Sequence, residues 1–208
     1  MSSENLPMSI LPKLSFKNQA FKLREHAILD AATAVLSSKG YDLMTMDDVA
    51  GAVGISKPSL YKHFKSKEEL VGEALIRLLD GALEYVAALD PGLGPLEKLS
   101  TLLEWALRVR LDGGLPFLPS TSPHVRDMLI RNVKYMLRVM KLNRQLEALV
   151  KQAQQQGMLN RDLPTDVILF SYYARTCDPA VEYLQKYSKM APEDIVRHML
   201  TVSFDGLR

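Results

Sequence analysis

Apolar residues recur every three or four positions along most of the chain, which is the period of an amphipathic helix. Between residues 21 and 38 this stripe contains Ile28, Ala32 and Leu36, and Gly40 follows it as a stop signal. No run of useful length alternates apolar and polar residues, as a half-buried strand would. We therefore predict an all-α protein.

Two short helices are predicted close together between residues 45 and 64. Thr45 can cap the first helix, Asp48 completes a variant of the capping box three residues later, and Gly54 ends the helix. Ser56 can then cap the second helix. Two short helices joined by a tight glycine turn are typical of a helix-turn-helix motif.

The remaining pattern predicts longer helices. Ser66 and Glu69 form a capping box that opens a helix to about Leu89, and the Pro- and Gly-rich residues 90–95 are interpreted as the hinge between an N-terminal unit and the rest. Asp178-Pro179 is expected to kink or split a helix. Further helical patterns cover residues 96–111, 124–156, 165–188 and 192–204.

Three parts are predicted from these boundaries. Residues 1–19 contain two prolines and are expected to be a flexible arm. Residues 20–66 form a three-helix domain with the helix-turn-helix, and residues 67–208 form a larger helical domain. The chain of 208 residues is 47% hydrophobic and 24% charged, which is typical of a globular protein and excludes wholesale disorder.

Charge and cysteine content add a location and a candidate partner. The net charge of +2 gives no general argument for binding nucleic acid, but residues 57–67 contain four lysines, a histidine and no acid. The single cysteine, Cys177, excludes an intramolecular disulfide and fits a reducing compartment. Because there is no secretory segment and no run of 18 apolar residues, we expect a cytoplasmic protein without membrane contact.

The second short helix has an inner and an outer face. Val49, Ile55 and Leu60 are expected to form the small core between the two helices. Lysine can read guanine or hold a phosphate, hydroxyl groups can serve either purpose, and Pro58 can touch a thymine methyl group. The polar side chains left on the outer face are Lys57, Ser59, Tyr61, Lys62 and His63.

Three elements then occur together at fixed spacing: the glycine turn, the string Leu-Tyr-Lys-His-Phe at 60–64 and the cap Ser-Lys-Glu-Glu at 66–69. In combination they resemble the DNA-binding domain of the tetracycline-repressor (TetR) family. The resemblance covers about the first 80 residues. It implies a DNA-binding transcriptional regulator that binds a palindromic operator as a homodimer, is released by a small-molecule effector, and acts as a repressor.

The resemblance also assigns roles to individual residues. Contacts with phosphate are implied for Thr45, Tyr61, His63 and Lys67, and contacts with bases or the flanking sugar and phosphate for Lys57, Pro58, Ser59 and Lys62. Asp47 departs from the pattern, because some members carry a basic base-reading residue there. An acid cannot contact phosphate or guanine in that way, although it can accept a hydrogen bond from cytosine. The operator sequence is therefore not transferable.

The last two predicted helices are expected to form the homodimer interface, since a single recognition helix reads too few bases. In the family the corresponding helices form a four-helix bundle. Their apolar positions are Val167, Ile168, Phe170, Tyr172, Tyr173, Ile195, Val196, Met199, Leu200 and Phe204.

The helices before that interface are expected to enclose the site of a small apolar or amphipathic effector. Effector binding would tilt the long helix that begins at Lys67 and move the two recognition helices out of register. Methionine and aromatic walls suit an adaptable apolar pocket. The candidate lining residues are Leu102, Trp105, Phe117, Met128, Tyr135, Met136, Met140, Tyr172 and Cys177.

The predicted DNA contacts, the effector pocket and the regulatory function each have an alternative interpretation. Tyr61 and Phe64 can be packing residues, the lysines can form a solvated face, and each pocket candidate taken singly is more simply a core residue. The four histidines show no metal-binding spacing and no nucleotide-binding or hydrolase motif occurs, so we expect neither an enzyme nor a cofactor. The main alternative is an all-helical dimeric ligand-binding or protein-interaction module without sequence-specific DNA binding. Within the regulator class, activation is compatible with the sequence as well.

Overall fold

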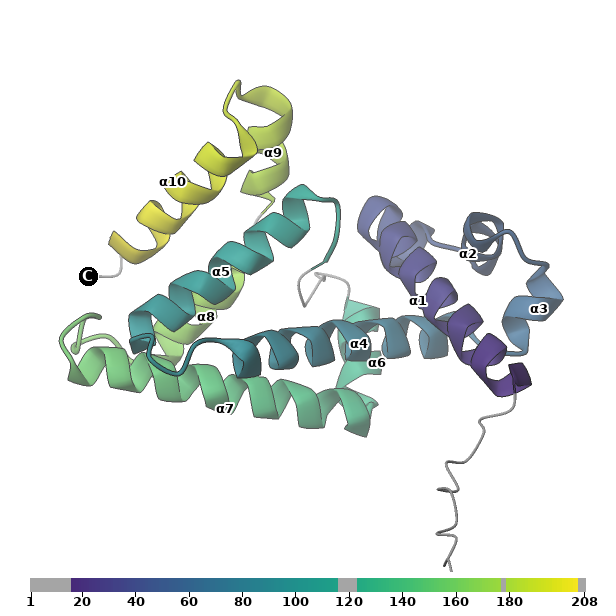
Figure 1. Cartoon of the computed structure of the whole chain (residues 1–208), viewed down its shortest axis with the longest axis horizontal. Coiled ribbons are helices and arrows are strands. Elements are labelled where there is room, and N and C mark those ends of the chain that lie inside the picture. The colour runs from purple at the N-terminus through teal and green to yellow at the C-terminus, as the bar shows by residue number, and fades with distance from the viewer. Residues whose placement is uncertain (1–15, 116–122, 177–178, 206–208) are drawn as a thin grey trace, which may run out of the picture.

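The computed structural model describes residues 16–115, 123–176 and 179–205, and within these ranges the chain forms ten α-helices and no strand (Figure 1). The predicted all-α class is confirmed. The helices are α1 (Phe16–Leu43), α2 (Met46–Val53), α3 (Lys57–Tyr61), α4 (Lys67–Ala88), α5 (Pro95–Leu111), α6 (Pro123–Arg131), α7 (Val133–Gln155), α8 (Thr165–Thr176), α9 (Ala180–Tyr187) and α10 (Pro192–Asp205).

The first three helices form a compact unit at one end of the molecule (Figure 1). Gly54 ends α2 with φ of 74°, a left-handed conformation that a residue with a Cβ rarely adopts, so the chain turns sharply into α3. Ser56 caps α3 by accepting a hydrogen bond from the Ser59 N–H at 3.3 Å. The side chains of Ile28, Val49 and Leu60 are fully buried between the helices. The predicted helix-turn-helix is therefore present.

Helix α1 begins earlier than the sequence predicts. Residues 16–19 were expected to belong to the flexible arm, yet they are helical. Extending an existing helix is much easier than nucleating one, and the Phe21 ring fixes this turn by stacking on His63 of the same unit. The rest of the predicted arm lies outside the described residues.

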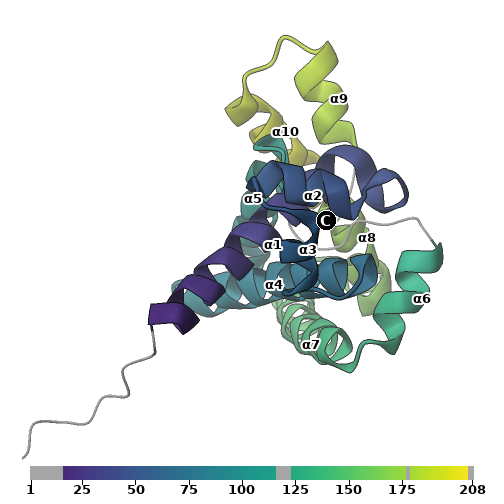
Figure 2. The same cartoon turned by 90° about the vertical axis from the view of Figure 1, so that its right-hand side faces the viewer.

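The proline- and glycine-rich segment 90–95 is a turn rather than an interdomain hinge. Asp90 accepts a hydrogen bond from the Gly92 N–H at 2.8 Å, and Glu97 accepts one from the Gly94 N–H at 2.7 Å, so the segment reverses the chain between α4 and α5. Helix α4 continues from the helix-turn-helix unit into the larger domain, where it lies along α7 (Figures 1 and 2). It therefore belongs to both parts of the molecule.

The predicted helix 124–156 is two helices. Asn132 interrupts it with φ of −85° and ψ of 102°, and its side-chain oxygen accepts the Tyr135 N–H at 3.1 Å as the cap of α7. An internal cap of this kind leaves the apolar period intact, which is why periodicity alone missed the break. The region 165–188 is divided into α8 and α9, as Asp178-Pro179 predicted, although residues 177–178 lie outside the described part.

Helix α5 is at the centre of the larger domain. It contacts α7, α8, α9 and α10, and its Leu99, Leu102, Leu103 and Leu107 side chains are almost completely buried. At about 1.5–3 kcal/mol for each buried side chain of this size, these leucines are a main source of stability for the domain.

Candidate nucleic-acid interface

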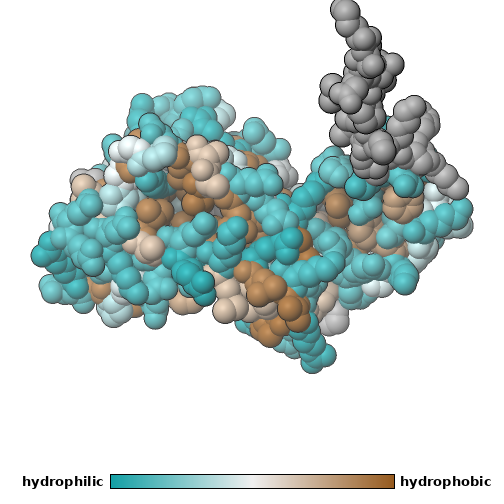
Figure 3. Space-filling model, turned by 60° about the horizontal axis from the view of Figure 1, so that its bottom comes forward, coloured by the Kyte–Doolittle hydropathy of each residue, from teal (hydrophilic) through white to brown (hydrophobic). Residues whose placement is uncertain are grey.

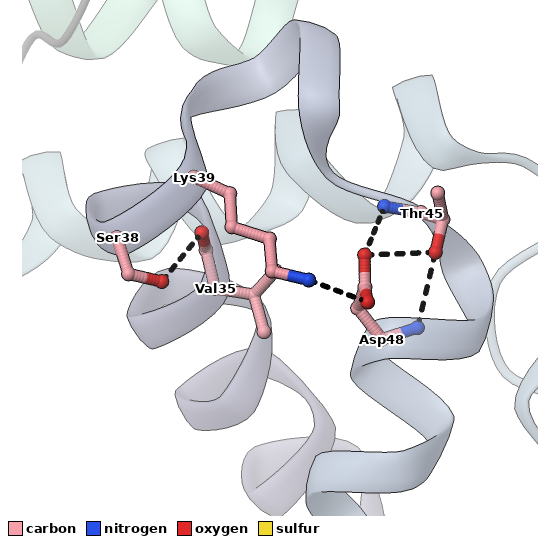
Figure 4. Close-up of polar contacts among 5 residues, drawn as sticks. All are labelled: Val35, Ser38, Lys39, Thr45 and Asp48. Atoms are coloured by element: carbon pink, nitrogen blue, oxygen red, sulfur yellow. Dashed lines mark hydrogen bonds and ion pairs between the residues drawn. The ribbon is translucent and has the colours of Figure 1, made fainter.

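Helix α2 is held in place by a capping box that also binds α1 (Figure 4). Thr45 accepts the Asp48 N–H at 3.1 Å, and Asp48 accepts from both the Thr45 N–H and the Thr45 hydroxyl, at 2.9 and 2.8 Å. The Lys39 ammonium donates to the other Asp48 oxygen at 2.7 Å. Lys39 first and Thr45 second lower the pKa of Asp48 to about 2. The hydroxyl of Thr45 is thus engaged within the protein.

The outer face of α3 is open to a partner. Leu60 is fully buried, whereas Pro58, Tyr61 and Lys62 are exposed, with 42% of the Tyr61 surface accessible. Ser59 is partly covered. Tyr61 therefore does not serve the core, while Phe64, only 3% exposed, does. The helix presents an aromatic ring, a cation and a proline ring side by side on its solvent face.

Lys57 is engaged by an acid from the neighbouring helix. Its ammonium donates to Asp47 Oδ2 at 2.7 Å, and the two side chains remain 48% and 65% exposed. This contact joins the first turn of α2 to the first turn of α3. The Asp47 carboxylate raises the pKa of the Lys57 ammonium, which therefore stays charged.

His63 lies at the edge of this face and is partly withdrawn from it. Its ring stacks on Phe21 with 4.1 Å between the centroids, and its Nδ1 is buried without a hydrogen-bond partner among the described residues. Burial lowers the pKa of His63; the Glu25 charge has a smaller effect that raises it, and the Arg24 charge a smaller one that lowers it further. A neutral ring in this position cannot hold a phosphate by charge. Phe21 was not singled out from the sequence, because the contact joins residues 42 positions apart.

Lys67 begins α4 and lies over an aromatic ring. Its Nζ is 4.2 Å from the centroid of Tyr41, whose hydroxyl donates to Glu68 at 3.1 Å. Burial and the Glu68 charge raise the pKa of Tyr41 to about 12. Glu69 completes the helix start by accepting from the Lys65 N–H, not from the Ser66 N–H as a full capping box requires.

The effector-pocket candidates are only partly brought together. Leu102 and Tyr135 are buried in the core, and Trp105, Met128 and Met136 are partly buried against it. Trp105 stacks on Tyr85 of α4 with 5.0 Å between the centroids, a contact that the sequence pattern does not indicate. Phe117 and Cys177 lie outside the described residues.

Met140 and Tyr172 lie away from this cluster. Met140 is 54% exposed on the outer face of α7, together with Val133 and Leu137. Figure 3 shows the face that contains α7, where hydrophobic side chains gather in patches on a mostly hydrophilic surface. Tyr172 is buried, donates to the Leu99 carbonyl at 3.0 Å, and lines a cavity of about 150 Å³ between α5, α8 and α10.

A larger hollow lies far from the helix-turn-helix. It has a volume of about 740 Å³ and is formed by the α4–α5 turn and the α7–α8 turn, at the opposite end of α4 (Figure 1). Leu96, Glu97, Met158 and Arg161 are among its lining residues. None of them was predicted from the sequence, because the two turns are more than 60 positions apart.

Most of the apolar residues of α8 and α10 are buried within the protomer. Ile168, Tyr172, Ile195, Val196, Met199 and Phe204 are buried within the chain and so are not free to contact a second copy. Val167 and Phe170 of α8 and Val202 of α10 remain exposed, with 66% of the Phe170 surface accessible. The residues left for an interface are thus fewer than the sequence indicated.

The described ranges contain neither a candidate metal site nor a candidate membrane span. No three His, Cys, Asp or Glu side chains come together there as a possible metal site. No helix in the same ranges is long and apolar enough to cross a membrane.

Similarity to known proteins is strongest in the helix-turn-helix region. Residues 28–74 match the family model of bacterial regulatory proteins, tetR family. The HTH-type transcriptional repressor KstR2 of Mycolicibacterium smegmatis is 40% identical over 80 residues, which are 38% of this chain and 39% of that protein. KstR2 of Rhodococcus jostii is 24% identical over 188 residues, 88% and 91% of the two chains.

The whole fold also occurs in solved structures. The transcriptional regulator FadR from Bacillus subtilis, in complex with stearoyl-CoA, superimposes with a TM-score of 0.63 over 88% of this chain and 99% of that one. At 15% identity, this shows the shared fold alone. The chain spans about two fifths of the length of the M. smegmatis relative that it matches. The family match and the helix-turn-helix geometry fall on the same segment, so the N-terminal domain of this chain is similar to the tetR family of bacterial regulatory proteins.

Proposed function

We propose that the chain is a DNA-binding transcriptional regulator, acting as a repressor in the cytoplasm, and that α3 is its recognition helix. The observation that carries the proposal is the two-sided nature of α3, whose Leu60 is fully buried while Pro58, Tyr61 and Lys62 face solvent. A recognition helix needs such an anchor in its own domain and such side chains for phosphates and base edges. The proposal assigns no catalytic activity to the chain.

The regulator binds a palindromic operator as a homodimer. Two copies place their recognition helices about 34–36 Å apart, one turn of the DNA. Exposed Val167 and Phe170 of α8 and Val202 of α10 supply the apolar surface for a two-fold contact between the last helices. Both helices line the same small cavity, so these surfaces are neighbours.

A small apolar or amphipathic effector releases the operator. The stearoyl-CoA held by the FadR of B. subtilis is an amphipathic molecule with a long aliphatic chain. The Met128, Met136 and Trp105 side chains of the present chain are partly buried, and the two methionines are flexible enough to fit an aliphatic ligand. The effector acts by binding the released conformation more tightly than the DNA-bound one.

Helix α4 is the element through which release is transmitted. Arg77 pairs with Asp30 of α1, and Asp80 pairs with Arg138 of α7 at 2.7 Å, so α4 holds the recognition unit on one side and the larger domain on the other. Tyr85 of α4 stacks on Trp105 of α5. A ligand that separates this stack changes the position of α4 and with it the spacing of the two α3 helices.

DNA binding is tested first, by titrating the protein with the duplex upstream of its own gene in the presence of unrelated competitor DNA. The wild type is expected to survive competition and to weaken steeply with salt, since phosphate contacts release counterions. Tyr61→Ala/Lys62→Ala is expected to lose specific binding. Lys141→Ala, which removes an exposed cation from α7, is the control and keeps it. A selection from random duplexes follows if that fragment is not bound.

The same selection separates the regulator from the main alternative. If the wild type enriches no sequence, the chain is an all-helical ligand-binding or interaction module and the proposed function is wrong. If wild type and the double variant enrich the same sequence with equal affinity, α3 is not the recognition helix.

The effector is tested through Trp105, the single tryptophan of the chain. Stearoyl-CoA is expected to change the Trp105 fluorescence in a saturable manner and to release operator DNA over the same concentration range. Free coenzyme A and stearate alone are the controls for the two ends of the ligand. If stearoyl-CoA binds tightly but leaves operator affinity unchanged, effector-induced release is wrong.

A further inference from the structure

The exposed ion pair between Asp47 and Lys57 lies where α2 and α3 meet on the outer face of the helix-turn-helix. Both side chains are about half exposed or more, and their 2.7 Å contact is the only hydrogen bond that either side chain makes among the described residues. The adjacent Asp48 is engaged by Thr45 and Lys39. The two acids of the first turn of α2 therefore differ: Asp48 holds α2 to α1, whereas Asp47 is paired only with Lys57 and is exposed to solvent.

Stability does not explain this pair. An exposed Lys–Asp contact contributes about 0–1 kcal/mol. Close to DNA it has a cost, because the Asp47 carboxylate repels phosphates and occupies a lysine that would otherwise bind them. A carboxylate that lies beside the start of the recognition helix, as Asp47 of α2 does, favours DNA binding only if the DNA supplies a hydrogen-bond donor for it.

One base pair supplies that donor together with an acceptor for the lysine. In the major groove cytosine presents the N4 amine, while guanine presents O6 and N7 as neighbouring acceptors. Cytosine N4 and guanine O6 are joined by an N–H···O bond of about 2.9 Å, close to the 2.7 Å between Lys57 Nζ and Asp47 Oδ2. The ion pair can thus lie edge to edge against a C·G pair without breaking.

The other pairs fit less well. An A·T pair places its single donor, the adenine N6 amine, between the acceptors adenine N7 and thymine O4. If the Asp47 carboxylate accepts from that amine, it also lies beside an acceptor that repels it. The Lys57 ammonium can reach only one of the two acceptors. Phosphates offer acceptors alone, so they repel the Asp47 half of the unit.

We propose that Asp47 and Lys57 act as one reading unit for a single C·G base pair in each half-site, with Asp47 accepting from cytosine N4 and Lys57 donating to guanine O6 and N7. This inference rests on the proposed DNA-binding function. In this role Asp47 determines specificity: its charge lowers the affinity for DNA of most sequences, but its hydrogen bond to cytosine restores the affinity where a C·G pair is present.

The test is selection from a randomised duplex pool, followed by titration of the selected operator with each single base-pair change. For the wild type, replacing the C·G pair is expected to weaken binding about 5- to 100-fold, the range for one good base contact. Asp47→Ala and Lys57→Met are expected to lose this preference at the same position. Asp47→Asn is expected to shift the preference towards A·T, because an amide pairs with adenine N6 and N7.

Asp42→Asn is the control, since it removes one exposed negative charge of the same domain without touching the ion pair. It is expected to change affinity for all sequences alike and to alter no positional preference. Thermal unfolding of each variant, expected to match the wild type, shows that the domain is folded.

Three outcomes decide the inference. If the wild type selects a sequence and Asp47→Ala selects the same one with every preference intact, the reading unit is wrong while the DNA-binding function stands. If Asp47→Ala and Lys57→Met alter different base pairs, the two residues do not act as one unit. If the wild type selects no sequence, the failure is that of the proposed function itself.

Discussion

The Lys39 ammonium, directly before the kink at Gly40 in α1, donates to the Asp48 carboxylate in the first turn of α2 at 2.7 Å (Figure 4). Because Asp48 also accepts the N–H and hydroxyl of Thr45, a single carboxylate sets the angle at which α2 leaves α1. The exposed Lys39–Asp48 contact therefore orients the outer face that α2 and α3 share.

This carboxylate makes the stability of the domain dependent on pH. The pKa of Asp48 is about 2, compared with 3.8 when unperturbed, so its contribution is present above pH 4 and is lost as the pH falls from about 4 to 2. Asp48→Asn is expected to unfold more easily at neutral pH and to lose less stability over that acid range. Urea unfolding at several pH values between 2 and 7 measures the stability at neutral pH and its loss in acid, with Asp42→Asn as the control. Parallel curves for wild type and Asp48→Asn would contradict the assignment.

Removal of the Phe21 ring is expected to raise the pKa of His63 towards its ordinary value of about 6.5, because burial is the main cause of its depression. NMR titration of the His63 ring measures this shift, and Leu23→Ala on the exposed side of α1 is the control. Since the folded-state pKa lies below the unfolded one, wild-type stability declines as the pH falls below about 6.5. This decline should be smaller in Phe21→Ala. An unchanged His63 titration would show that Phe21 does not cover the ring.

Gly51 inside α2 and Gly54 directly after it are expected to respond in opposite ways to substitution by alanine. Gly54 has φ of 74°, so Gly54→Ala should lower the free energy of unfolding by about 1–2 kcal/mol. Gly51 is inside the helix, and a Cβ there meets no atom within 4 Å, so Gly51→Ala should raise it by roughly 0.5–1 kcal/mol. Denaturant unfolding of both variants gives the comparison. A loss of stability in Gly51→Ala would mean that α2 contacts something at this position.

Phe170→Glu is expected to convert the proposed dimer into a monomer of 23.4 kDa and to weaken operator binding. A charge in the middle of an apolar helix contact has no partner and must be desolvated. Light scattering after size exclusion gives the mass of each variant. Leu137→Glu places the same charge on an equally exposed position of α7 and should stay dimeric. If Leu137→Glu dissociates and Phe170→Glu does not, the interface involves α7 instead.

The sequence by itself determined the helical class, the helix-turn-helix and its caps. These depend on neighbours within a few residues: Thr45 with Asp48, the left-handed turn at Gly54 and Ser56 with Ser59 are local devices that periodicity and capping rules recognise. The burial of Leu60 and Phe64, with Tyr61 between them on the outside, follows from the same helical period.

Only the tertiary structure decided which polar groups remain available and how the longer helices are used. Asp47 meets Lys57, Phe21 covers His63, and Lys67 lies over Tyr41, and each of these contacts joins two separate segments of the fold. No pattern along the chain specifies such contacts, because they depend on the angle at which one helix crosses another. The same reason accounts for the apolar residues of α8 and α10: periodicity identifies an apolar face, but packing on α5 decides which part of it is left for a second copy.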